Sequence, residues 1–185
     1  MEPTITVLIG SPLSGDETCF LRRLHADLAD TEGIILANFT AGDRQIDFVV
    51  VTAAHAAAIL ELKNFPRPVF GEENGDWTFL DSAGQRVRYS GVNPYQQTTK
   101  QKYALSDKMK RYQEKNPGVP PPSGRGFFQD FSAFVCIFPS IHPDSGVTLG
   151  DHKVAVRSYA DIIDELRSES KASSWSLSNW RDFAE

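Results

Sequence analysis

The chain has 185 residues, 41% of them hydrophobic, which is enough apolar material for one globular domain, spanning residues 1–185, to bury its own core. A net charge of -5 argues against a basic coat of the kind that gives strong stand-alone binding to nucleic acid, because such affinity comes from many Lys and Arg contacts with phosphate. Two cysteines do not make a disulfide framework and indicate a reducing compartment.

The sequence shows neither a secretion signal nor a membrane span. Residues 1–9 lack a basic start, and their apolar stretch is too short for a signal peptide. The longest apolar runs are also much shorter than the roughly 20 residues that cross a bilayer. We therefore expect a soluble, cytoplasmic protein with no membrane partner.

The first half of the chain predicts a helix followed by short strands. Ser14 or Asp16 caps a helix that runs to about Leu28, with an inward apolar stripe and Glu17 in its first turn, where the helix dipole favours an acid. Branched and apolar runs separated by turn residues then indicate strands. These expected strands cover residues 34–39, 46–51, 58–62, 77–80 and 87–90.

The second half predicts one long helix and a smaller C-terminal helical part, residues 158–185. Asn93 caps the long helix, Pro94 occupies its first position, and it ends near Glu114. A stiff Pro-rich loop follows. Further strands are expected at residues 133–138 and 154–156, and helices at residues 159–168 and 173–184, the last capped by Ser176 or Ser178.

Three charged residues stand among apolar neighbours in the segment IDFVVVTAAHAAAILELKN. Glu61 and Lys63 point to the same side of their strand, because side chains alternate faces. If the strands at 46–51 and 58–62 form a hairpin, Asp47 lies close to both. Two hard oxygen ligands suit Mg²⁺ or Mn²⁺. The alternative is structural: Asp47 as a turn residue, and Glu61 with Lys63 as an exposed salt bridge of little energetic value.

The long helix carries a second polar group, formed by Gln97, Lys100 and Gln101. Residues three and four apart share a helix face, so this stripe is a candidate substrate contact for a phosphate or nucleoside, through Lys100 and Gln101 in particular. The alternative is an ordinary solvated face. A basic cluster that partly offsets the acidic net charge lies on the same helix at Lys100, Lys102, Lys108, Lys110 and Arg111.

An acid, a spacer and then E-x-K form the signature of the PD-(D/E)XK nuclease superfamily, and the surrounding text resembles its nuclease-related domain branch, known as NERD. The likeness covers residues 15 to 106 approximately. It rests on DETCFLRRL, IDFVVV, LELKN, the tryptophan turn GDWTF and the helix start NPYQQ, which appear in family order. The family often has a glycine-rich turn where this chain has alanines and His55.

The resemblance implies an α/β fold with a mixed central β-sheet flanked by helices, a restriction-endonuclease-like core at about residues 14–138. It also implies metal-dependent cleavage of phosphodiester bonds, with DNA as substrate, in DNA processing, repair or defence. The family's site residues would fall on Glu17, Asp47, Glu61, Lys63 and Gln97, with Gln96 as the less favoured choice for the last.

The roles follow from the same resemblance. Asp47, Glu61 and the Leu62 main-chain carbonyl would bind Mg²⁺ or Mn²⁺, and Glu17 would bind a second ion directly or through water. Lys63 would position or deprotonate the attacking water. Gln97 would orient Lys63 or the phosphate.

Other classes remain open at the level of sequence. The scattered histidines lack zinc-ligand spacing, and neither cysteine has the setting of a nucleophile. A catalytically inactive nucleic-acid-binding or regulatory domain is the alternative to an enzyme. By resemblance to the family, such a domain is attached to a helicase or kinase-like partner, which would make this chain the N-terminal portion of a larger protein, and a homodimer is also open.

Overall fold

The computed structural model describes residues 4–53, 57–122, 126–150, 153–168 and 173–185. The turn expected between the two charged strands lies mostly outside these ranges, as do His55 and His152.

The central sheet of the described residues contains six strands: β1 (Ile5–Ile9), β2 (Gly33–Ala41), β3 (Arg44–Thr52), β4 (Ala58–Lys63), β8 (Ser132–Ile137) and β10 (Ala155–Ser158). They lie in the order β1-β2-β3-β4-β8-β10. β2, β3 and β4 are antiparallel neighbours, whereas β1, β8 and β10 pair in parallel with the strand beside them. The sheet is therefore mixed, as the family resemblance implies.

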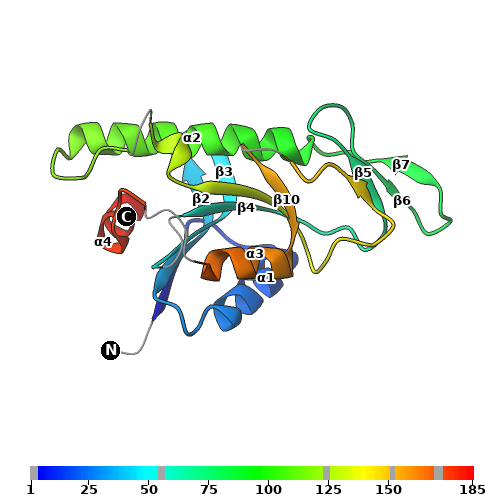
Figure 1. Cartoon of the computed structure of the whole chain (residues 1–185), viewed down its shortest axis with the longest axis horizontal. Coiled ribbons are helices and arrows are strands. Elements are labelled where there is room, and N and C mark those ends of the chain that lie inside the picture. The colour runs from blue at the N-terminus through cyan, green and yellow to red at the C-terminus, as the bar shows by residue number, and fades with distance from the viewer. Residues whose placement is uncertain (1–3, 54–56, 123–125, 151–152, 169–172) are drawn as a thin grey trace.

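Helices cover both faces of this sheet (Figure 1). α1 (Gly15–Asp27) and α3 (Tyr159–Arg167) pack on one face, where Phe20, Leu24 and Ile162 meet the alternate apolar residues of the strands. α2 (Pro94–Lys115) and α4 (Leu177–Ala184) cover the other face. Each fully buried side chain of this kind contributes about 1.5–3 kcal/mol, so the two cores fix the sheet between the helices. This is the α/β architecture expected from the sequence.

Local sequence explains where the helices begin. Ser14, Ser158 and Ser176 each cap a helix, and each forms a capping box with the side chain three residues later. Asn93 accepts a hydrogen bond from the Gln96 N–H, and Pro94 stands at the first helical position of α2. The starts of α1, α2 and α3 agree with the sequence predictions, whereas α4 begins at Leu177 and not at residue 173, after the expected Ser176 cap.

A second, smaller sheet lies at one end of the molecule, beside the N-terminal end of α2 (Figure 1). Its strands are β5 (Val69–Gly71), β6 (Thr78–Leu80), β7 (Arg86–Arg88) and β9 (Gly146–Val147), in the order β7-β6-β5-β9. Trp77 packs directly on Gly71, where any added Cβ would lie 2.4 Å from the indole ring. The predicted hairpin is present as β6 and β7, although each strand is shorter than expected.

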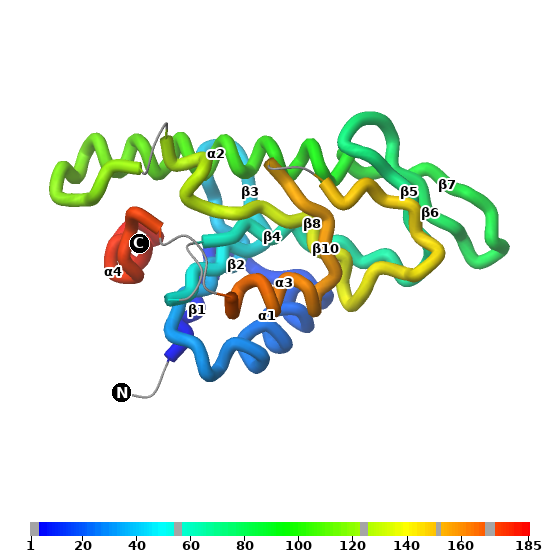
Figure 2. Tube along the Cα trace, viewed as in Figure 1, coloured from blue at the N-terminus to red at the C-terminus, as the bar shows by residue number. Residues whose placement is uncertain are grey.

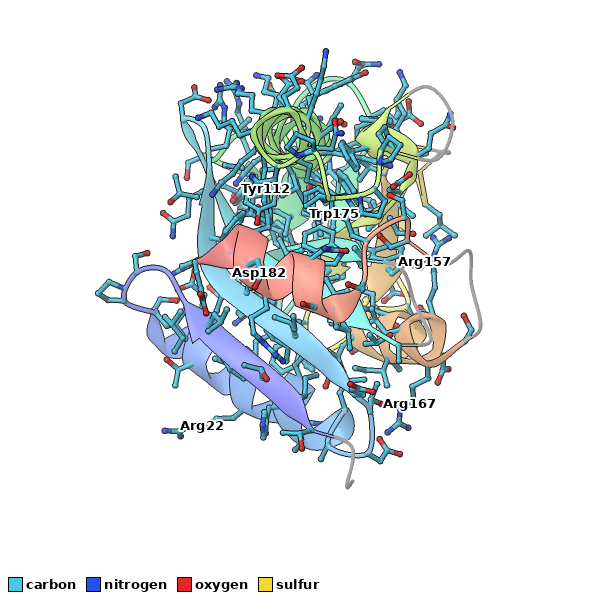
Figure 3. All side chains as sticks on the ribbon, turned by 90° about the vertical axis from the view of Figure 1, so that its left-hand side faces the viewer. Arg22, Tyr112, Arg157, Arg167, Trp175 and Asp182 are labelled. Carbon is cyan, nitrogen blue, oxygen red and sulfur yellow. The ribbon has the colours of Figure 1, made fainter. Side chains whose placement is uncertain are left out.

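The chain path places α4 at the opposite end of the molecule from this sheet (Figure 2). An aromatic cluster attaches α4 to α2: the Trp175 ring lies 5.7 Å from Tyr112 and 5.5 Å from Trp180. Figure 3 shows Tyr112 and Trp175 on this side, with Asp182 on the same helix as Trp180. A short 3-10 helix, η1 (Phe127–Gln129), precedes β8. In the part of the chain described, no helix is both long enough and apolar enough to cross a membrane.

Candidate metal and phosphodiester site

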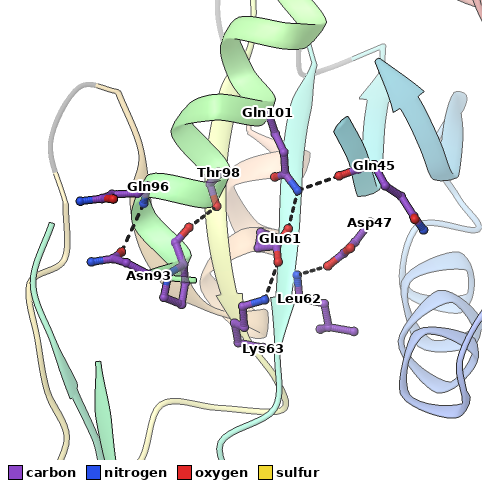
Figure 4. A network of polar contacts seen from close by, with 10 residues as sticks. Gln45, Asp47, Glu61, Leu62, Lys63, Asn93, Gln96, Thr98 and Gln101 are labelled. Atoms are coloured by element: carbon purple, nitrogen blue, oxygen red, sulfur yellow. Dashed lines mark hydrogen bonds and ion pairs between the residues drawn. The ribbon is translucent and has the colours of Figure 1, made fainter. Parts of the chain in front are cut away.

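Asp47 lies where the ladder between β3 and β4 ends. The hairpin pairs Val50 with Ala58 and Phe48 with Leu60, and the β3–β4 ladder contains no pair beyond Phe48 and Leu60. Beyond it, the Asp47 carboxylate takes the place of a main-chain acceptor: its Oδ2 accepts a hydrogen bond from the Leu62 N–H at 2.8 Å (Figure 4). The side chain of Asp47 is thereby held against β4.

A local irregularity of β2 lies beside the same point. Ala37 pairs with Phe48 and Phe39 pairs with Ile46, but Asn38 and Asp47 between them form no ladder pair. Asn38 has a φ of 49°, in the left-handed region, where a residue other than glycine is uncommon. Its Nδ2 donates to the Pro12 carbonyl at 2.9 Å, which stabilises this conformation. Both ladders of β3 are thus interrupted at Asp47.

Glu61 and Lys63 project from the same face of β4, as their alternation predicts. Lys63 Nζ donates to Glu61 Oε1 in an ion pair, and Glu61 is only 1% exposed. Gln101 of α2 completes the group: its Nε2 donates to Glu61 Oε2 at 2.6 Å and to the Gln45 carbonyl at 2.9 Å (Figure 4). Both carboxylate oxygens of Glu61 are therefore oriented by neighbouring donors.

The surroundings shift the protonation of two of these groups. Burial, together with the nearby charge of Glu61, raises the pKa of Asp47 from the ordinary 3.8 to about 7. Burial lowers the pKa of Lys63, but the charge and hydrogen bond of Glu61 outweigh this effect, so the net pKa is raised. Lys63 is consequently a cation at neutral pH in this arrangement.

The donor set fits one hard divalent cation. Asp47 has one carboxylate oxygen besides the one bound to Leu62, and each oxygen of Glu61 keeps a second lone pair. The N–H and C=O of one strand residue point toward the same neighbouring strand. Because the Leu62 N–H points toward Asp47 on β3, the Leu62 carbonyl is directed toward the same side. Gln101 Oε1, buried beside Glu61, has no hydrogen-bond partner among the described residues. Two carboxylates and a carbonyl are ligands that Mg²⁺ and Mn²⁺ prefer.

Glu17 lies near this site, but its carboxylate forms part of the helix cap of α1. Its Oε2 accepts from the Ser14 N–H at 2.6 Å, in the capping box of α1. After burial and Glu61, its charge is among the influences that raise the pKa of Asp47. Within the described ranges, no three His, Cys, Asp or Glu side chains lie close enough to bind a metal together. Binding of a second ion by Glu17 remains a prediction.

The glutamine that reaches Glu61 lies one helical turn after the one expected from the family pattern. Gln97 is half-buried, and its side chain makes no hydrogen bond to any described residue. Gln96 is also half-buried, and its main-chain N–H bonds to Asn93. Gln101, expected to contact substrate, is 1% exposed and holds Glu61, whereas Lys100 is exposed.

Three contributors were not identified from the sequence. Asn38 interrupts β2 beside Asp47, the Gln45 carbonyl holds Gln101, and Tyr89 interacts electrostatically with Lys63. An Asn in the middle of an otherwise apolar strand is a signal that could have identified the first. The other two depend on tertiary packing, so no local pattern indicates them.

Comparison with known proteins adds one match. Residues 16–136, more than half of the chain, match the family model of the nuclease-related domain. The match includes α1, the β2–β3–β4 strands, α2 and nearly all of β8, and therefore every residue of the site described above. No curated protein and no solved structure matches the chain.

Proposed function

Because the chain belongs to the nuclease-related domain family, we propose that it is a metal-dependent nuclease that hydrolyses nucleic-acid phosphodiester bonds, with DNA as substrate. The observation that supports this most is the convergence of Asp47, Glu61 and Lys63 at the open end of the β3–β4 ladder. Glu61 is buried and paired with Lys63, whereas the half-buried Asp47 beside it forms no ion pair with any described residue and is costly to keep charged unless a bound cation compensates it.

In this proposal Asp47, Glu61 and the Leu62 carbonyl hold one Mg²⁺ or Mn²⁺. When bound, such an ion would supply Lewis-acid activation of the phosphate and of the attacking water. The deprotonated form of Asp47 is the one that binds, so its raised pKa makes metal affinity increase with pH up to about 7.

Lys63 acts as a positioned cation in the same scheme. Its raised pKa favours an ammonium that donates hydrogen bonds to the attacking water and to the phosphate oxygens, and that stabilises the negative charge of the transition state. Gln101 is a positioning residue, because it holds the Glu61 carboxylate through a hydrogen bond rather than touching the substrate.

The acidic net charge is compatible with this function. A net charge of -5 gives little long-range electrostatic attraction for nucleic acid. Local positive charge would come from the bound metal, from Lys63 and from the exposed basic side chains of α2. We expect low affinity and strong salt dependence rather than tight binding of duplex DNA.

The test is cleavage of supercoiled and linear DNA by the purified chain with Mg²⁺, Mn²⁺ or EDTA. We expect cleavage that EDTA abolishes and that falls at least a hundredfold in Asp47→Asn, Glu61→Gln and Lys63→Met. Asp182→Asn is the matched control, since this exposed acid lies on α4, away from the site (Figure 3).

Three results would count against the proposal. Cleavage that persists in EDTA, or that all three variants retain, would exclude this site. Metal-dependent binding of DNA without cleavage would instead indicate an inactive nucleic-acid-binding domain.

A further inference from the structure

A groove opens beside Lys63, between the segment that leaves β4 and the β6–β7 hairpin. Its volume is about 640 Å³, within the range of small-molecule sites. Asn64, the residue after Lys63, belongs to its wall, so the groove begins where the proposed site ends. The lining that matters here consists of Phe65, Arg67, Phe79, Val87, Arg88 and Tyr89.

Three aromatic rings form a wall of the groove. Phe65 is almost buried and packs against Tyr89 edge to face, with ring centroids 5.4 Å apart, and against Phe79 at 6.2 Å. Phe79 and Tyr89 are only half-buried, so parts of both rings remain accessible. Val87 is 38% exposed, an unusual exposure for a β-branched apolar residue. The groove therefore presents a flat, apolar and weakly hydrated surface.

Positive charge lies at the edge of this apolar surface. Arg67 is exposed and forms no ion pair with any described residue, whereas Arg88 is paired with Asp76 at 2.8 Å. Asp81, the acid of the lining, accepts hydrogen bonds from the Ala83 and Gln85 N–H groups within its own turn. Arg67 is thus available to an anion of the ligand.

The groove is also linked to the proposed chemistry. Asn64, the residue next to Lys63 in the chain, lines the groove, and Phe65 after it packs against Tyr89 with ring centroids 5.4 Å apart. A ligand that occupies the groove therefore lies next to any phosphodiester held at Lys63. Rings for stacking and a free cation, in a groove sized for one or two nucleotides, are the features of single-strand binding surfaces.

We propose that this groove binds an unpaired base of the nucleic acid, directly beside the scissile phosphodiester, so that the substrate is a single strand or a single-stranded end. The base stacks on Tyr89 and Phe79, and Arg67 contacts its phosphate. A base inside a duplex cannot present its face to these rings. This inference rests on the proposed function for the position of the phosphodiester, but not for binding itself.

Binding is measured without metal, so that cleavage does not enter. A fluorescent 12-nucleotide single strand and the same strand annealed to its complement are titrated in EDTA, with fluorescence anisotropy as the readout. We expect the wild type to prefer the single strand. Arg67→Glu should weaken single-strand binding about tenfold, since one phosphate contact becomes a repulsion. Arg181→Glu makes the same charge change on α4, at the opposite end of the molecule, and should alter binding less than about twofold (Figure 1).

Stacking has its own readout. A strand containing 2-aminopurine should lose fluorescence on binding to the wild type, and Tyr89→Leu should retain that fluorescence while a thermal melt verifies its fold. Equal affinity for single strand and duplex, or equal loss in Arg67→Glu and Arg181→Glu, would overturn the inference.

The two proposals fail separately. Metal-dependent cleavage of duplex DNA without single-strand preference would overturn the groove alone. Single-strand binding and quenching without any cleavage would overturn the nuclease alone.

Discussion

Replacing Asp47 by Asn should make the protein more stable while it abolishes metal binding and cleavage. The amide is nearly isosteric, and its oxygen can still accept the hydrogen bond that the Leu62 N–H donates at 2.8 Å. What disappears is a buried charge next to Glu61. Removing it relieves repulsion in the folded state and has little effect on the unfolded chain.

The size of the effect follows from the pKa of Asp47, which burial and Glu61 raise from 3.8 to about 7. Below pH 3.8 the carboxyl is protonated in both states, and there is no penalty. Between these values the unfolded chain loses its proton while the folded protein keeps it, so the free energy of unfolding falls as pH rises. The penalty is on the order of 2 kcal/mol at pH 5 and on the order of 4 kcal/mol above pH 7.

Urea unfolding of wild type and Asp47→Asn at pH 5 and pH 8 measures this directly, with Asp182→Asn as the control. We expect the gain from Asp47→Asn to be about 2 kcal/mol larger at pH 8 than at pH 5. Millimolar Mg²⁺ should stabilise the wild type at pH 8 but not the variant. A variant that is less stable than the wild type at pH 8, or a gain that does not depend on pH, would refute the reasoning.

Substitutions at three further positions test other parts of the structure. Gln101→Leu removes the hydrogen-bond donor to Glu61, so kcat for DNA cleavage should fall about tenfold while the melting temperature changes by only a few degrees. A kcat equal to that of the wild type would contradict a positioning role. Tyr159→Phe removes a 2.7 Å hydrogen bond to Asp27, which is the first cause of that carboxyl's lowered pKa. The substitution should cost about 1 kcal/mol at pH 7, and the cost should shrink as the pH falls toward the lowered pKa and the carboxylate becomes protonated; urea unfolding over a series of pH values measures this, and a cost that does not depend on pH would contradict it. Asn38→Val should lower the free energy of unfolding by about 1–3 kcal/mol, because a β-branched residue is strained at a φ of 49°. Asn38→Gly should lower it less, although it also loses the hydrogen bond to Pro12. If urea unfolding gives an equal loss of stability in both variants, the hydrogen bond and not the backbone conformation is the cause.

The parts of the fold that the sequence predicts are those with local causes. α1 and α3 begin at serine caps, and α2 begins at Asn93 and Pro94, so their starts could be read from a few adjacent residues. The β2–β3–β4 strands are apolar runs bounded by turn residues. In each case the information lies within one segment, and tertiary contacts reinforce it rather than override it.

The missed strands depend on partners that are distant in sequence. Among the described strands, the five-residue edge strand β1 pairs only with β2, and α1 separates the two strands in the sequence. β5 and β9 have three and two residues, and they pair with each other across more than 70 positions of the chain. Runs this short have no distinctive periodicity, so nothing local separates them from loops.

The candidate site divides in the same way. The predicted proximity of Asp47, Glu61 and Lys63 depends on one hairpin and on side-chain alternation, both of which are local rules. Gln97 and Gln101 differ by one helical turn and share a face, so the sequence alone cannot decide which of them reaches Glu61. The position of α2 along its own axis, relative to β4, determines which glutamine reaches Glu61, and packing between the helix and the sheet sets that position.

The two acids of the site differ in how far their charges are compensated by neighbouring groups. Glu61 is neutralised by Lys63 and held by Gln101, so its buried charge is already compensated. Asp47 accepts a hydrogen bond from Leu62 but forms no ion pair with any described residue, and burial together with the charge of Glu61 raises its pKa. Asp47 is therefore the uncompensated acid of this group, and a divalent cation bound there would offset its charge and stabilise the fold by an amount set by the ion's concentration and affinity. Metal affinity and the free energy of unfolding should then change together with pH, through this one carboxyl.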